Sequence, residues 1–311
     1  MPTRRKFIQT TSLTALSPFI LKAISTNPLS GTLRASLNPG AIGLQCNPKS
    51  LLDYAKTFGF KAISPLLNDL LSFTKTEKLN YLAEMKDLGI VFDAGGLPIQ
   101  FRTTESEFQQ GLKYLQTNIE AIANLKIPSF VTWVMPTHPS LTYLKNFELH
   151  RNRLQQVAQV LGSEGLRLGL EYVGPKTLMV RNKYPFLHTI SGLRELIDAI
   201  KSDNIGYLLD SFHTYCAKDE NKDLDFLELK DIVSVQINDG VLNRNPDTQL
   251  DQERELPGDS GLIDLRSFLN LLQSKGYVGP VSVEPFNRSI NKMEDLPKLN
   301  RVRRSLQKFG I

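Results

Sequence analysis

Short apolar runs alternate with longer amphipathic stretches from residue 39 to the end of the chain. Eight of these runs are expected to form strands, at residues 41–46, 60–67, 90–96, 129–136, 166–173, 205–210, 232–239 and 278–286. Helices are expected between them, over residues 48–59, 69–88, 104–125, 143–164, 191–202, 223–230, 263–276 and 295–308. Strands that alternate with helices form parallel sheets, and eight such units favour closure into a ring. The pattern therefore predicts an α/β fold, a single (β/α)8 TIM barrel over residues 39–311.

The N-terminal segment has a different composition from the rest of the chain. Residues 1–25 begin with Arg4 and Arg5 and continue into an apolar run that holds Ser and Thr but no acidic residue. We expect a twin-arginine signal peptide at 1–25 and a linker at 26–38, so that the protein is periplasmic or otherwise exported by the twin-arginine pathway. The alternative is a basic amphipathic helix. Because the apolar run is short, no stable membrane insertion is expected after signal removal.

The charge balance of the chain depends on this segment. Residues 1–25 hold four of the 37 basic residues, and without them 33 basic residues face 32 acidic ones. The net charge therefore does not indicate nucleic-acid binding. Cys46 and Cys216 form no metal-binding pattern; two separate buried thiols are the preferred interpretation, and export leaves a disulfide open. The sequence also leaves open whether residues 295–308 contact a second subunit in a homo-oligomer.

Polar side chains end four of the expected strands in the second half of the chain. They are Glu171, Asp210, Gln236 and Glu284. The C-terminal strand ends of a parallel barrel form one ring, so these side chains should lie close together. A lone strand-end carboxylate is more often a helix cap or a surface charge. Three carboxylates in one site repel one another, however, and oxygen donors of this kind suit a divalent metal ion. The four residues together predict a metal site.

At these residues the chain resembles the sugar phosphate isomerase/epimerase superfamily, the xylose isomerase-like TIM barrels, over about residues 39–309. The resemblance rests on the motifs LEYVGP, LLDSFH, VQINDG, ELPGDSGLIDL and GYVGPVSVEPF. In that family a Glu, an Asp, a His and a Glu from the last four strands hold one divalent ion. The resemblance assigns this role to Glu171, Asp210 and Glu284.

Gln236 departs from the family pattern, because many members have His at this position. An amide oxygen is a harder and weaker ligand than imidazole, which favours Mn²⁺ or Mg²⁺, with Co²⁺ or Zn²⁺ as alternatives. Gln236 can instead be a residue that only forms hydrogen bonds beside the site. Asn238 and Asp239, which follow it, are expected to form a turn.

The resemblance also implies catalytic and substrate-binding roles. Glu171 and Glu284 match a pair of carboxylates that move protons, and His213 matches a His that contacts a substrate oxygen. Arg254 is open between a substrate-binding group and a surface loop charge. Trp133 is open between an aromatic wall for a sugar ring and ordinary core packing.

The leading hypothesis is an exported, metal-dependent sugar isomerase or epimerase that acts on a keto-sugar or polyol by proton transfer through an enediolate. Alternatives are a metal-dependent lyase or dehydratase on a keto-sugar or cyclic polyol, and a non-catalytic sugar-binding protein. A DNA-repair endonuclease of the same fold is disfavoured, because its zinc cluster is rich in His and only four His occur here. Sequence does not separate isomerase from lyase, since both begin with proton abstraction beside a carbonyl.

Overall fold

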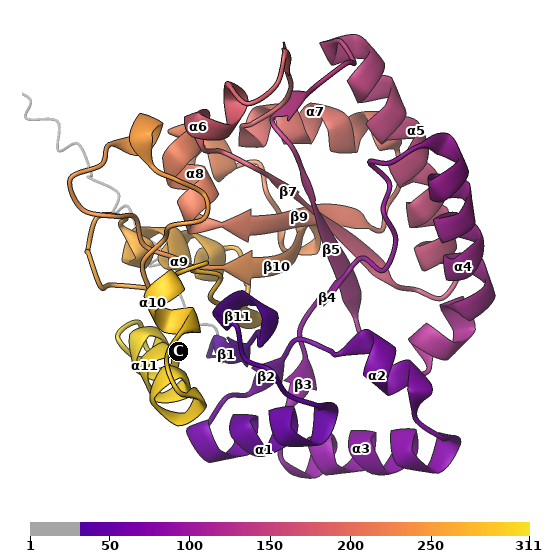
Figure 1. Ribbon diagram of the computed structural model, residues 1–311, viewed down its shortest axis with the longest axis vertical. Coiled ribbons are helices and arrows are strands. Elements are labelled where there is room, and N and C mark those ends of the chain that lie inside the picture. The colour runs from indigo at the N-terminus through magenta and orange to yellow at the C-terminus, as the bar shows by residue number, and fades with distance from the viewer. Residues whose placement is uncertain (1–31) are drawn as a thin grey trace, which may run out of the picture. The chain divides into compact units, whose positions relative to one another are not determined.

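Most of the apolar runs of the sequence form a ring of parallel strands, with helices around it (Figure 1). The structure is a computed structural model that describes residues 32–311. The predicted signal peptide at 1–25 lies outside the described residues. The strands are β1 Arg34–Leu37, β2 Ala62–Ile63, β3 Val91–Phe92, β4 Gly95–Gly96, β5 Ser129–Val134, β6 Thr137–His138, β7 Arg167–Tyr172, β8 Tyr184–Pro185, β9 Ile205–Asp210, β10 Ile232–Gln236 and β11 Pro280–Ser282.

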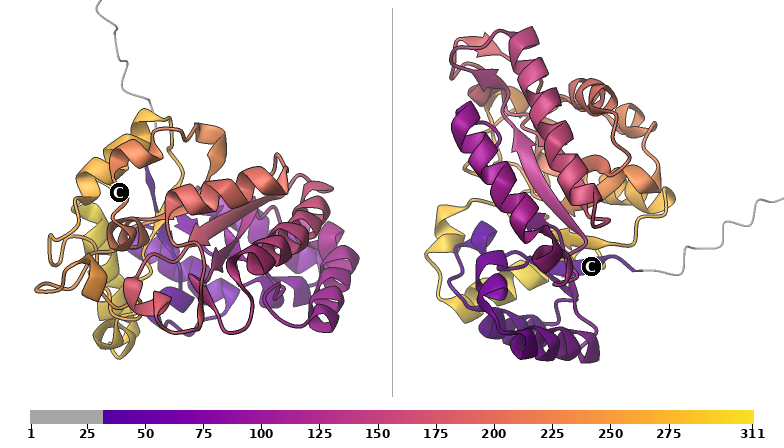
Figure 2. Two further views of the ribbon diagram at one scale, coloured as in Figure 1. Left: turned by 90° about the horizontal axis from the view of Figure 1, so that it is seen from above. Right: turned by 90° about the vertical axis from the view of Figure 1, so that its right-hand side faces the viewer.

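The helices follow the strands in alternation, as the sequence predicts. They are α1 Pro48–Phe58, α2 Leu67–Ser72, α3 Lys75–Asp87, α4 Glu105–Ala123, α5 Tyr143–Gly162, α6 Lys176–Met179, α7 Ile190–Ile200, α8 Ser211–Ala217, α9 Leu265–Ser274, α10 Arg288–Asn291 and α11 Asp295–Gln307. In both views of Figure 2 the long helices lie on the outside of the sheet. No helix among the described residues is long and apolar enough to cross a membrane.

The main sheet closes into a barrel because one of its eight strands is interrupted and pairs with a different neighbour on each side of the break. The order of strands is β3-β2-β1-β11-β10-β9-β7-β5-β4, with every neighbouring pair parallel. β3 pairs with β2, and β4, only three residues further along the chain, pairs with β5. These two short strands are halves of one interrupted strand, so the nine segments occupy eight positions of a ring. The prediction of a TIM barrel is confirmed.

Three predicted elements differ from the structure. The first strand is β1, not residues 41–46, and it lies in the segment that we expected to be a linker, so the barrel begins before residue 39. Residues 40–42 form a short 3-10 helix. The helix predicted at 69–88 is two helices, because Thr74 begins α3 with a capping box. The helix predicted at 223–230 is wrong: this segment holds only the 3-10 turns η2 Asn221–Leu224 and η3 Leu229–Asp231.

The helix starts and buried faces follow from local sequence. Thr189 accepts a hydrogen bond from the backbone N–H of Gly192 and begins α7, as its position in the sequence predicts. Side chains spaced three or four residues apart on α5 and α7 are buried, including Leu154 and Leu161 on the first and Leu193 and Ile200 on the second. Burial of these stripes against the sheet holds the strand ends in place.

Candidate active site at the carboxyl end of the barrel

The strand pairing places the predicted site residues at similar heights on neighbouring strands. Gln236, the last residue of β10, is paired in register with Asp210 of β9 on one side and with Ser282 of β11 on the other. Glu171 of β7 is in register with Trp133 of β5. Glu284 follows β11 by two residues. The structure therefore brings Glu171, Asp210, Gln236 and Glu284 to one end of the barrel, as predicted.

Asp210 is both a helix cap and a member of the carboxylate cluster. Its Oδ1 accepts a hydrogen bond of 2.7 Å from the backbone N–H of Phe212, which begins α8. Its Oδ2 accepts one of 2.9 Å from Nη1 of Arg254, and the amide of Asn238 lies 3.2 and 3.1 Å from the two oxygens. These bonds fix the carboxylate in one orientation.

His213 lies on α8 with 2% of its surface exposed, and a backbone group just after β7 contacts its ring. The N–H of Gly174 donates to Nδ1 of His213 at 3.3 Å. Only glycine fits there, because a Cβ on residue 174 would lie 2.2 Å from the carbonyl oxygen of His213. Burial, together with the nearby Arg254, lowers the pKa of His213 to about 4. The ring is therefore neutral. Its Nε2 lies 3.3 Å from Nη2 of Arg254 and 3.7 Å from Oε1 of Glu171.

The side-chain amide of Gln236 lies between two carboxylates. One amide atom is 3.1 Å from Oε2 of Glu284 and 3.2 Å from Oδ2 of Asp210. If this atom is nitrogen, it donates to both carboxylates. If it is oxygen, three oxygens face one another, which either a cation or a protonated carboxyl group makes favourable. Gln236 thus fits either of the two roles expected from the sequence.

Arg254 is a buried cation, so the alternative of a surface loop charge is wrong. Only 1% of it is exposed, and its guanidinium carbon lies 4.8 and 4.9 Å from the ring centres of Phe212 and Phe286. Its Nη1 and Nη2 donate to Asp210 at 2.9 Å and to Asp251 at 2.8 Å. Phe286 has a φ of 46°, a strained conformation for an aromatic residue, and so is held in place by its surroundings.

The site has more negative than positive charge. Four carboxyl groups surround the single guanidinium of Arg254: Glu171, Asp210, Asp251 and Glu284. Burial, with the charges of Glu284 and Asp210, raises the pKa of Glu171 well above its usual range. Burial also raises the pKa of Glu284 to about 7, while Arg254 opposes that rise. Without a further cation, the cluster must hold protons that ordinary carboxylates lose at neutral pH.

The residues fit a divalent cation. Oε1 of Glu171 is buried and has no hydrogen-bond partner among the described residues, which leaves an acceptor free for an ion. By distance alone, Glu171, Asp210 and His213 also form a possible ligand set, with one atom of each within 4.8 Å of the others. The guanidinium of Arg254 lies 3.3 Å from Nε2 of His213, and its positive charge disfavours a cation at that nitrogen, so we favour Gln236 and Glu284 over His213 as the remaining ligands.

Three residues near the site have roles that the sequence analysis missed. Asn238 does not form a simple turn: it is fully buried, donates to Asp210 and accepts a 2.7 Å bond from the N–H of Glu284. Asp239 accepts from the N–H groups of Gly261, Leu262 and Ile263 and so anchors the loop of the PGDSG motif. Asp251 pairs with Arg254. In the sequence, only the position of Asn238, two residues after Gln236, indicated that it could lie in the site.

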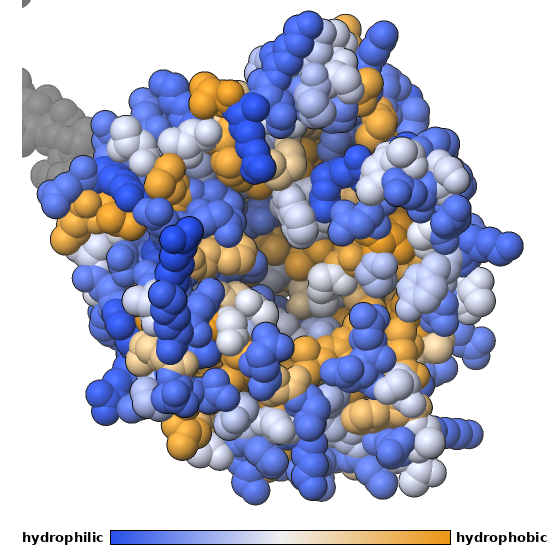
Figure 3. Space-filling model, viewed as in Figure 1, coloured by the Kyte–Doolittle hydropathy of each residue, from blue (hydrophilic) through white to orange (hydrophobic). Residues whose placement is uncertain are grey.

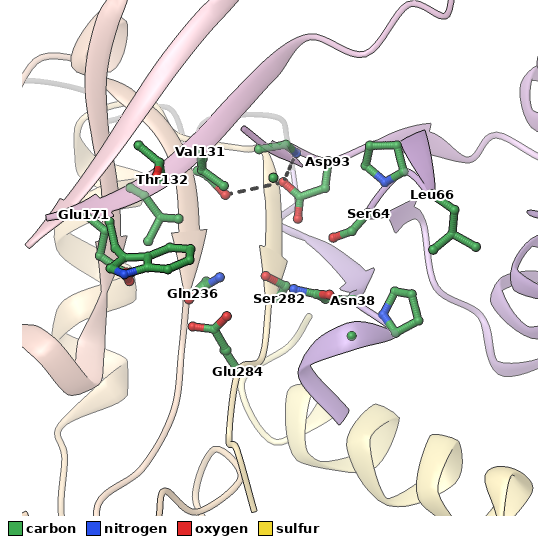
Figure 4. Close-up of a pocket in the computed structure, with 18 residues that line it drawn as sticks. Asn38, Ser64, Leu66, Asp93, Val131, Thr132, Glu171, Gln236, Ser282 and Glu284 are labelled. Carbon is green, nitrogen blue, oxygen red and sulfur yellow. Dashed lines mark hydrogen bonds between the residues drawn. The ribbon is translucent and has the colours of Figure 1, made fainter. Parts of the chain in front are cut away.

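Two cavities meet at the carboxylates, and both are lined by Trp133, Glu171 and Glu284. One of about 310 Å³ also holds His213, Asp251 and Arg254, and the other, of about 300 Å³, extends toward the first three strands (Figure 4). The face of the molecule drawn in Figure 3 is hollowed near its centre. Trp133 is 45% exposed, so the alternative of core packing is wrong, and its ring forms part of the cavity wall.

The chain belongs to the xylose isomerase-like TIM barrel family, whose model matches residues 52–309. Among characterised proteins it is similar to the inosose isomerase of Halalkalibacterium halodurans, with 28% identity over 191 residues. That match covers 58% of this chain and 61% of the relative. The inosose isomerase of Bacillus subtilis is 28% identical over 146 residues, which are 45% of this chain and 47% of the relative. The matched regions thus span about half to three fifths of these relatives.

Solved structures of the same fold cover nearly all of the chain. A xylose isomerase domain protein from Alicyclobacillus acidocaldarius has a TM-score of 0.78 at 28% identity, over 89% of this chain and 98% of that one. The IolI protein, solved with a bound zinc atom, has a TM-score of 0.71 at 21% identity, over 89% and 96%. D-psicose 3-epimerase, solved with D-fructose, has a TM-score of 0.68 at 14% identity, over 89% and 98%. At these identities the last two show the fold alone.

Proposed function

We propose that this protein is a divalent-metal-dependent isomerase or epimerase that acts on an unphosphorylated keto-sugar or cyclic polyol by proton transfer. The observation that carries the proposal is the pair formed by Glu171 and Glu284. Both carboxylates face the same cavities, and the buried Oε1 of Glu171 has no hydrogen-bond partner among the described residues. A carboxylate that is open to a cavity and poorly solvated is a competent base toward a carbon acid.

Each site residue has a definite task in this proposal. Glu171 removes a proton from the carbon beside a carbonyl, and Glu284 returns one. His213 is neutral and contacts the substrate oxygen that gains charge. Trp133 contacts one face of the substrate ring, and Arg254 binds a substrate oxygen from the cavity side of its ion pairs. Buried partners hold His213 and Arg254 in place, which limits reorganisation during the reaction.

The proposed metal ligands are Glu171, Asp210, Gln236 and Glu284. A bound Mn²⁺ or Mg²⁺, or alternatively Co²⁺ or Zn²⁺, would polarise the carbonyl and make the neighbouring proton more acidic. The negative charge of the cluster and the free oxygen of Glu171 support the presence of an ion. The names of the relatives support the reaction class, since they are inosose isomerases, and neighbours of the same fold include D-psicose and L-ribulose 3-epimerases.

Solvent exchange tests the proposal directly. The purified protein is first analysed for metal, then incubated in D₂O with 2-keto-myo-inositol or D-fructose, and the products are examined by NMR. We expect about one divalent ion per chain, and deuterium at a carbon beside the carbonyl together with an epimer or isomer. Both signals should be lost with a chelator. Glu171→Gln and Glu284→Gln should lose exchange, whereas Glu120→Gln on the surface of α4 should not.

Other outcomes would select the alternative functions. Loss of the proton beside the carbonyl with formation of an unsaturated product would identify a lyase or dehydratase, because the same proton abstraction then ends in departure of a β-hydroxyl. Ligand binding without exchange on any of these keto-sugars, with or without metal, would contradict an isomerase and favour a sugar-binding protein.

We also propose that the protein is exported by the twin-arginine pathway, on the basis of Arg4, Arg5 and the apolar run that follows them. Export favours a sugar without phosphate. Fractionation of cells that express the full chain, followed by N-terminal sequencing, should give a periplasmic form that begins near residue 25. Replacement of both arginines by lysine should retain the protein in the cytoplasm; unchanged location of that variant would refute this proposal.

A further inference from the structure

The cavity of about 300 Å³ has a polar wall that faces the carboxylate cluster from the other side of the barrel. Asn38, Ser64 and Asp93 each come directly after a strand, β1, β2 and β3 in turn. Together with Ser282, at the end of β11, these residues form what we call the hydroxyl wall. In Figure 4 these side chains and Glu171, Gln236 and Glu284 surround the same space. The hydroxyl wall is thus built by strand ends, as the carboxylate cluster is, but three of its four residues come from the first half of the chain.

Asp93 is the centre of the hydroxyl wall. It lies where the third strand is interrupted between β3 and β4, with 4% of its surface exposed. Its Oδ1 accepts a bond of 2.7 Å from the N–H of Ala94 and one of 3.5 Å from Oγ of Ser234. Burial raises the pKa of this carboxyl. The bonds that are drawn in Figure 4 leave the side chains of Ser64 and Ser282 without a partner among the residues shown. Hydroxyl groups of a ligand can therefore be bound here.

Charged residues are distributed unevenly between the two cavities. No Lys, Arg or His lines the cavity with the hydroxyl wall, so far as the described residues show, whereas Asp93, Glu171 and Glu284 all do. The neighbouring cavity is lined by Arg181, His213 and Arg254. A phosphate or carboxylate placed against the hydroxyl wall would meet only carboxyl groups and neutral dipoles, which disfavours anions.

We propose that the hydroxyl wall binds the hydroxyl groups of an uncharged cyclic polyol or keto-sugar, with Asp93 as the residue that selects a hydroxyl over a phosphate. The reacting carbon then lies at Glu171 and Glu284, an assignment that rests on the function proposed above. The cavity is at the small end of the range for ligand pockets, which suits one ring rather than two. Ser64 and Ser282 bind further hydroxyls as donor or acceptor.

Trp133 makes this inference testable, because it is the only tryptophan in the chain and lies in the cavity wall. Its fluorescence is measured while myo-inositol, D-fructose or D-fructose 6-phosphate is added, in the presence of Mg²⁺ and again with a chelator. We expect the two uncharged ligands to bind at least ten-fold more tightly than the phosphate. Asp93→Leu should weaken the binding of the uncharged ligands about ten-fold or more, because a hydrogen bond to a carboxylate is lost.

Further variants separate binding from folding. Asp93→Asn keeps the size and one acceptor, so it should fold and weaken binding less than Asp93→Leu. Ser64→Arg places a cation in the hydroxyl wall and should shift preference toward D-fructose 6-phosphate. Asp53→Asn, an exposed acid on α1, is the matched control and should bind as the unaltered protein does. Unchanged affinities in both Asp93 variants, or equal binding of D-fructose and its phosphate by the unaltered protein, would overturn the inference.

The result is distinguishable from failure of the proposed function. Asp93-dependent polyol binding in a protein that binds no metal and exchanges no deuterium would uphold the hydroxyl wall and refute the isomerase. Metal binding and deuterium exchange that persist, with substrate affinity unchanged in both Asp93 variants, would uphold the isomerase and refute the hydroxyl wall.

Discussion

Arg254→Met is the substitution that most directly tests how the site balances its charges. Methionine is long enough to pack between Phe212 and Phe286, so the contacts with the two rings are largely kept. The variant removes the cation that pairs with Asp210 at 2.9 Å and with Asp251 at 2.8 Å. Loss of one partner of a buried ion pair costs about 3–5 kcal/mol. For a domain of this size that corresponds to a fall in Tm on the order of 10 °C.

A divalent cation supplies positive charge to the same carboxylates, so it should offset part of this loss. Thermal unfolding is followed by circular dichroism, with a chelator and with excess Mn²⁺, for the unaltered protein and for Arg254→Met. We expect the rise in Tm caused by Mn²⁺ to be larger in the variant. Arg254→Lys keeps the charge and is the control, with a smaller loss. A metal-free Arg254→Met that unfolds within a degree or two of the unaltered protein would refute the reasoning, because the carboxylates would then need no counter-charge.

Three further perturbations give results that can be checked separately. Glu284→Gln should lower bound metal well below that of the unaltered protein in elemental analysis, and full retention would remove Glu284 from the ligand set. Gln236→His should raise the affinity for Zn²⁺ about ten-fold or more relative to Mg²⁺ in calorimetric titrations, since imidazole is the better ligand for Zn²⁺; an unchanged ratio would mean that Gln236 only donates hydrogen bonds to the carboxylates. Burial lowers the pKa of His150 from 6.5 to about 4, so the unfolded chain takes up this proton first as the pH falls. The free energy of unfolding should therefore fall by about 3 kcal/mol as the pH is lowered from about 6.5 to 4. In urea unfolding, the free energy of unfolding of His150→Gln should depend less steeply on pH over this range. Equal slopes would show that His150 does not titrate in this way.

The strands β7, β9 and β10 were predictable because each has five or six residues, most of them apolar. β7, β9 and β10 fall within the predicted runs, and each ends at or beside a polar residue that the strand pairing places in the site. Strands buried on both faces give continuous apolar runs, so a polar residue at the end of such a run stands out. The positions of Glu171, Asp210 and Gln236 followed from this contrast.

The first half gave a weaker signal, for physical reasons. β2 and β3 have two residues each, and β1 has the sequence RASL, in which two of four residues are polar. The run at 41–46 is apolar because this connecting segment is covered by the rest of the fold. Ile42 and Leu44 are buried, and Nζ of Lys298 on α11 donates to the carbonyl of Gly43. Apolar composition indicates that a segment is covered, not which backbone conformation it has. Because Asn38 was placed outside the fold, the hydroxyl wall was missed.

The charge balance of the site depends on residues that the sequence indicated and on others that only the structure brings together. The sequence supplied three carboxylates and the conclusion that a cation must balance them. The structure adds a fourth, Asp251, and the guanidinium of Arg254, which reaches Asp210 across 44 positions of the chain. One fixed positive charge against four carboxyl groups still leaves an excess that either protons or a divalent ion must neutralise. The raised pKa values of Glu171 and Glu284 describe the first solution, and the free oxygen of Glu171 leaves room for the second. Arg254 therefore reduces the need for a metal without removing it. Arg254→Met thus distinguishes a cluster that is neutralised by protons from one that is neutralised by a divalent ion.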